Sequence, residues 1–93
     1  MTRTVGVLGG MGPDATVDFM ARVIEATPAK KDQDHLRILV DNNPHVPNRQ
    51  DALLRGGEDP GPELARMARG LEAAGADFLV MPCNTCLLYT SPS

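Results

Sequence analysis

Residues 5–14 read VGVLGGMGPD, and this stretch decides the fold. The apolar run that ends at Leu8 predicts a buried parallel strand, and the glycine pair after it predicts a tight turn. Pro13 suits the first turn of a helix, and the carboxylate of Asp14 suits the positive end of a helix dipole. The stretch therefore predicts a strand, a turn and a helix in direct succession.

The same alternation continues along the chain. The helix that follows carries apolar residues at i, i+3, i+4 and i+7, which predicts one buried face made of Val17, Met20, Ala21 and Ile24. Residues 36–40 predict a second strand and residues 78–81 a third. Between them, a helix opening at Glu63 is predicted to bury Leu64, Met67, Ala68 and Leu71. This order predicts an α/β fold, a three-layer parallel sheet with helices on both faces.

Length and composition restrict the class of protein. The 93 residues carry a net charge of −3 and are 42% hydrophobic, which is typical of one small globular unit. The mild acidity gives no broad basic surface, so we expect no nucleic-acid partner. No apolar run approaches the ~20 residues that span a bilayer, and the N-terminus lacks the apolar segment of a signal peptide. We therefore expect a cytoplasmic protein with no membrane contact.

A polar loop follows each predicted strand. Because the carboxyl ends of parallel strands meet at one edge, these loops are expected to form one site. In the second loop, Arg49 offers a planar fork that can grip a carboxylate with two hydrogen bonds, whereas His45 is interpreted as an ordinary loop residue. Cys83 follows the third strand, and Asn84 and Thr85 could donate hydrogen bonds to its thiolate or to a substrate. Taken singly, Arg49 fits an ordinary exposed loop arginine better than a binding residue, and Cys83 also fits a buried structural cysteine.

Two other patterns allow different interpretations. Residues 10–15 match the dinucleotide pattern G-x-G-x-x-A, and Asp41 lies roughly where a ribose-binding acid would stand. A long polar loop follows Asp41 instead of a short turn into a helix, and the glycine turn could equally bind a carboxylate. Cys83 and Cys86 have the C-x-x-C spacing of redox and metal sites. A single pair cannot close a tetrahedral zinc site, so no metal is expected.

Three segments together resemble the aspartate/glutamate racemase family: Gly6 to Thr16, Asn42 to Arg49, and Met81 to Thr85. The resemblance implies two similar α/β domains with the active site between them, residues 1–85 being the N-terminal part of the first domain. It also implies interconversion of L and D acidic amino acids without a cofactor, and a homodimer as the complete enzyme. By the same resemblance Cys83 is one of two catalytic cysteines, and the substrate-binding residues are Met11, Gly12, Arg49, Asn84 and Thr85.

Inverting an α-carbon requires a proton to leave one face and another to arrive on the opposite face, which two opposed thiols can accomplish. The family pattern continues after Thr85 with Ala-His, whereas Cys86 and Leu87 stand here. We therefore expect residues 86–93 to be a non-native tail that resembles a translated read-through, and the chain as written to be a truncated, inactive fragment. Three alternatives stay open: a catalytically dead family member, another cysteine-dependent isomerase or decarboxylase of this superfamily (a maleate isomerase or arylmalonate decarboxylase), and a nucleotide-binding module.

Overall fold

The computed structural model describes residues 3–47, 56–57 and 59–82 of the chain. Its strands are β1 (Thr4–Gly9), β2 (Arg37–Asn42) and β3 (Phe78–Val80). Its helices are α1 (Pro13–Ala26) and α3 (Gly61–Ala73), with a short 3-10 turn, η1 (Asp32–Asp34), before β2. The predicted alternation of strands and helices is confirmed.

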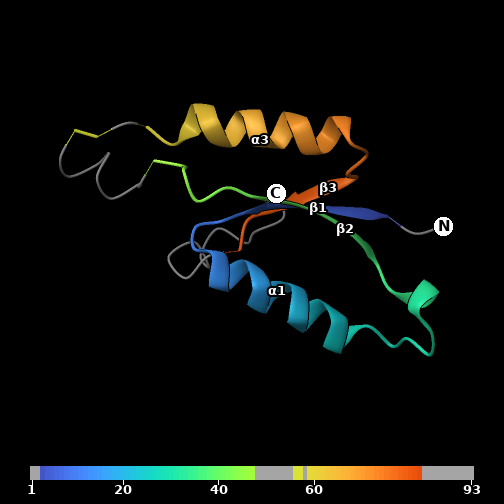
Figure 1. The fold of residues 1–93 in the computed structure, drawn as a ribbon. Helices are drawn as coiled ribbons and strands as arrows, with labels where there is room; N and C mark the ends of the chain where they lie inside the picture. The colour runs from blue at the N-terminus through green and yellow to red at the C-terminus, as the bar shows by residue number, and fades with distance from the viewer. Residues whose placement is uncertain (1–2, 48–55, 58, 83–93) are drawn as a thin grey trace.

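The three strands form a parallel sheet in the order β2-β1-β3. In the register of this sheet, Val7 of the central strand lies opposite Val40 on one side and Val80 on the other. Helix α3 covers one face of the sheet and α1 lies on the other face (Figure 1). The predicted three-layer α/β architecture is therefore confirmed for the part of the chain that the structure describes.

The core lies on both faces of β1: Gly6 packs closely on Leu71 of α3, whereas Val5 and Val7 alternate with Gly6 and face the side on which α1 lies. Val5 and Val7 of β1 are buried, as are Met67 and Leu71 of α3. Two of the four residues predicted for the buried face of this helix are thus fully in the core, and Leu64 and Ala68 are half-buried beside them. The predicted core-facing stripe of α3 is confirmed.

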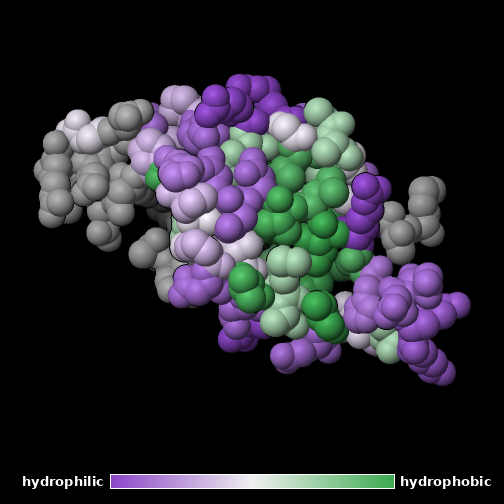
Figure 2. All heavy atoms as spheres, viewed as in Figure 1, coloured by the Kyte–Doolittle hydropathy of each residue, from purple (hydrophilic) through white to green (hydrophobic). Residues whose placement is uncertain are grey.

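The prediction for the buried face of α1 was wrong. Val17 is 66% exposed and Ile24 is 54% exposed, while the buried residue of this helix is Thr16. Spacing along a helix shows which residues share a face, but it does not show whether another element covers that face. Here α1 packs mainly on the central strand, and Thr16 in its first turn lies against Gly9 and Gly10. Figure 2 shows the hydrophobic surface that this leaves between the two helices.

The strand boundaries differ slightly from the predicted ones. β2 begins one residue later than expected and extends to Asn42, so that Asp41 lies within the strand and Leu36 precedes it. β3 ends at Val80, one residue earlier than expected. Within the described ranges, no helix is both long enough and apolar enough to cross a bilayer.

Candidate functional site

The loop after β1 is shaped by one buried hydroxyl. The backbone N–H of Gly10 donates to Oγ1 of Thr16 over 3.0 Å, and this hydrogen bond is buried. The same hydroxyl lies 3.5 Å from the carbonyl oxygen of Gly12, the residue that caps α1. Pro13 occupies the start of the helix as the sequence predicts. Thr16 therefore ties the glycine loop to the helix that follows it.

The loop after β2 packs directly on this first loop. The backbone N–H of Asn43 donates to the carbonyl oxygen of Gly9 over 2.9 Å. Gly10 has a φ of 104°, and a Cβ at this position would lie 2.5 Å from the backbone nitrogen of Asn43. Only glycine fits both requirements, because φ is left-handed and no side-chain atom has room. The two strand-end loops are thus in contact, as the parallel topology predicts.

The side chain of Asn43 extends the contact to α3. Its Oδ1 accepts a hydrogen bond of 3.0 Å from the backbone N–H of His45, and its Nδ2 donates to the Glu63 carboxylate over 2.7 Å. Glu63 lies in the first turn of α3 and also pairs with Arg66. Sequence reasoning missed this arrangement, because no local pattern links two residues that are twenty positions apart.

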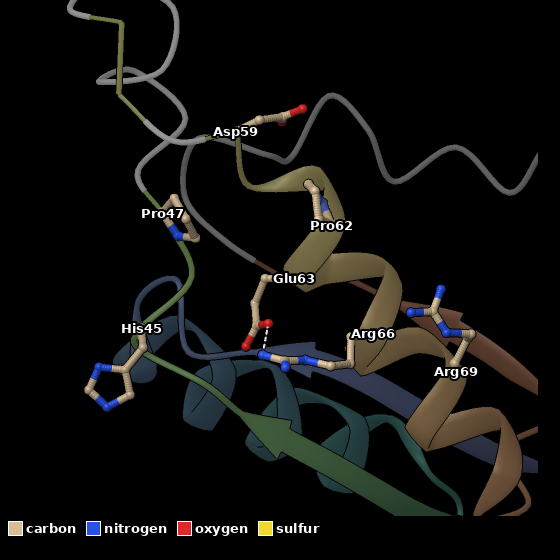
Figure 3. Close-up of a pocket in the computed structure, with 7 residues that line it drawn as sticks. All are labelled: His45, Pro47, Asp59, Pro62, Glu63, Arg66 and Arg69. Atoms are coloured by element: carbon tan, nitrogen blue, oxygen red, sulfur yellow. Dashed lines mark hydrogen bonds and ion pairs between the residues drawn. The ribbon is translucent and has the colours of Figure 1, made fainter.

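An open hollow of about 480 Å³ lies beside these residues. Its lining comes from the β2 loop and from the start of α3: His45, Pro47, Asp59, Pro62, Glu63, Arg66 and Arg69. Arg66 points to Glu63, whereas His45 and Arg69 lie apart and do not point toward a common position (Figure 3). Because its basic side chains do not converge, the hollow does not make an anion-binding site by itself.

The other predicted site residues divide into two groups. Met11 and Gly12 lie half-buried in the loop at the carboxyl end of β1. Arg49, Cys83, Asn84 and Thr85 lie outside the described residues. Met81 and Pro82, which follow β3, are half-buried, and Val80 before them pairs with Val7. The described chain therefore leaves β3 at the same edge of the sheet as the first two loops.

Comparison with known proteins assigns this architecture to a family. The Asp/Glu/hydantoin racemase family model matches residues 8–90. The chain belongs to this racemase family. It is 32% identical over 89 residues to the broad specificity amino-acid racemase RacX of Bacillus subtilis (strain 168), an alignment that covers 91% of this chain. It is also similar to the structure of the Picrophilus torridus aspartate racemase, with a TM-score of 0.83 and 38% identity over 94% of the chain.

The chain spans 38% of the length of each of these two racemases. The family match disfavours the dinucleotide interpretation. Gly10 is the first glycine of that pattern, the one that forms the tight turn, and a Cβ at this position would meet the backbone of Asn43. The glycine turn of this racemase-family chain is therefore built to receive the chain's own second loop.

Proposed function

We propose that this chain supplies one half of a cofactor-independent racemase site for an acidic amino acid. The supporting observation is the direct contact between the loops that follow β1 and β2, where a Cβ on Gly10 would meet the backbone of Asn43, at the carboxyl edge of a parallel sheet. Ligands of open parallel sheets bind at this edge. The family membership of the chain supports the same reaction type.

In this proposal the roles divide between carboxylate binding and proton transfer. Arg49, four residues beyond His45, binds a substrate carboxylate with its planar fork, and Met11 and Gly12 form the wall of the site at the end of β1. Cys83, three residues beyond β3, takes the α-proton as a thiolate or returns one as a thiol. Asn84 and Thr85 hydrogen-bond the thiolate or the substrate.

The complete inversion needs a second thiol on the other face of the substrate. One thiolate removes the α-proton and leaves a carbanion, and the opposed thiol donates its own proton to the other face. The bound carboxylate holds the α-carbon between the two sulfurs, so that proton transfer occurs over a short and fixed distance. The roles of the two thiols exchange when the substrate is the other enantiomer.

The test uses a protein of the relatives' full length that carries this segment. It is incubated in heavy water with L-aspartate or L-glutamate and followed by chiral chromatography and proton NMR. We expect the D isomer to appear with one deuteron at Cα, and Cys83→Ser to abolish racemisation in both directions. Near-normal turnover by Cys83→Ser would refute the assigned role. Loss of carbon dioxide from a malonate-type substrate, without racemisation, would identify a decarboxylase instead.

A further inference from the structure

We propose that Glu63 is a positioning residue of this site, which holds the loop after β2 in place through the side chain of Asn43. The inference rests on the proposed racemase function, because it concerns the loops that would form that site. Glu63 itself lies on α3, outside the strand-end loops. Its effect on a substrate would therefore be transmitted through Asn43.

Asn43 carries three interactions that fix the start of the second loop. Its backbone N–H reaches Gly9, its Oδ1 accepts from the backbone N–H of His45, and its Nδ2 donates to Glu63. The first bond joins the start of the second loop to the end of β1, and the second sets the turn that follows β2. Glu63 is the partner that comes from another layer of the fold, so it fixes the orientation of the amide group that makes the second bond.

The Asn43–Glu63 hydrogen bond has the features of a strong contact. It is short at 2.7 Å, its acceptor is a carboxylate, and the Glu63 side chain is only 23% exposed. Charge-assisted hydrogen bonds are roughly twice as strong as neutral ones, and partial burial reduces screening by water. Removing the carboxylate would also leave the Asn43 amide without this partner in a part-buried position.

The second partner of Glu63 provides a matched control. Oε2 of Glu63 accepts from Asn43, while Oε1 pairs with Arg66, whose side chain is 72% exposed. An exposed ion pair on one helix contributes little stability. Arg66→Met therefore removes the ion pair and leaves the Asn43 bond intact, whereas Glu63→Leu removes both.

The variants are chosen so that the direct contact can be broken and rebuilt. Glu63→Gln keeps an acceptor oxygen for Asn43. Asn43→Asp keeps the acceptor for His45 but replaces the donor with a second carboxylate facing Glu63. In the double variant Asn43→Asp/Glu63→Gln, the new glutamine amide can donate to the new aspartate, which restores the bond with reversed polarity.

The first readout is the Michaelis constant for the racemised amino acid in the full-length protein. We expect Glu63→Leu and Asn43→Asp to raise it about tenfold, the change that corresponds to one lost charge-assisted hydrogen bond of about 1.4 kcal/mol. Glu63→Gln, Arg66→Met and the double variant should stay within about threefold of the parent. A purely structural role would lower the melting temperature without this pattern in the Michaelis constant.

The second readout is amide hydrogen exchange in the 93-residue chain, with the amide of the fully buried Val7 as internal reference. We expect Glu63→Leu to speed exchange at Asn43 and His45 about tenfold relative to Val7, and the double variant to reverse this. Equal Michaelis constants for Glu63→Leu and Arg66→Met, or unchanged exchange, would overturn the inference. If the full-length protein racemises no amino acid, the proposed function fails, and the exchange pattern still decides whether Glu63 holds the loops.

Discussion

Replacing Thr16 by valine exchanges one hydroxyl of α1, which binds the loop after β1, for a methyl group of similar size. The Thr16 hydroxyl accepts the buried N–H of Gly10 at 3.0 Å, and valine has the same shape without an acceptor. The Gly10 N–H would then be buried without a partner, which costs about 1–3 kcal/mol. For a domain of this size, each 1 kcal/mol lowers the melting temperature by about 4–8 °C. A valine variant should therefore melt several degrees or more below the parent chain.

The matched control is Thr16→Ser, which keeps the hydroxyl and loses a methyl group. Deleting one buried methyl group costs about 0.8 kcal/mol, so stability alone separates the two variants poorly. The deciding measurement is amide exchange at Gly10, compared with the amide of Val7 in the same sample. The valine variant should lose protection at Gly10, and the serine variant should retain it.

The reasoning would be refuted by a Gly10 amide that exchanges as slowly in the valine variant as in the parent. In that case the amide is protected by burial alone, and Thr16 does not shape the loop. A serine variant that loses protection together with the valine variant would show that the hydroxyl is not sufficient and that the methyl group is needed as well, because Cγ2 of Thr16 lies 2.8 Å from the place of a Cβ on Gly9.

Four further outcomes are expected. Gly10→Ala should destabilise the chain by more than about 2 kcal/mol in urea unfolding, because it adds an unfavourable φ to a clash with the Asn43 backbone. In the full-length protein Arg49→Lys should raise the Michaelis constant markedly with the fold unchanged by circular dichroism, because lysine cannot form the bidentate contact. Deleting residues 86–93 should leave the melting temperature unchanged; a large loss would show that this segment is native. The 93-residue chain alone should form no D-aspartate above a Cys83→Ala control in chiral chromatography, because only one proton-transfer thiol is expected.

The sequence predicted the sheet well because its strands are short apolar runs bounded by glycine, proline and polar residues. Val5 and Val7 are buried on the central strand, between two neighbouring strands and on the face toward α1, an environment that a continuous apolar run indicates directly. The stripe on α3 was also predictable, since Met67 and Leu71 are one helical turn apart and face the central strand. In both cases the residues with the apolar pattern are the ones that another element covers.

The stripe on α1 could not be predicted in the same way. Val17 and Ile24 have the spacing of a buried face, yet they are exposed because the described part of the chain places nothing over them. Thr16, a polar residue, takes the buried position because its hydroxyl is needed by the amide of Gly10. A hydropathy pattern ranks threonine below valine for burial, so it does not identify a side chain that is buried because of its hydrogen bond.

The residues of the candidate site also fall into a predictable group and an unpredictable one. Residues that would touch a substrate follow strand ends, and they can be located from sequence because parallel topology brings strand ends together. Residues that hold those loops come from other layers: Thr16 from α1 and Glu63 from α3. Thr16 accepts directly from a loop backbone amide, and Glu63 acts on one through the Asn43 side chain. Both contacts depend on how a helix is placed against a loop in space, which the spacing of residues in the sequence does not show. The two loops are held from opposite faces of the sheet, and their contact at Gly10 and Asn43 lies between these supports. A change at either support should therefore reach both loops, which makes Thr16 and Glu63 sensitive positions even though neither is expected to touch the substrate.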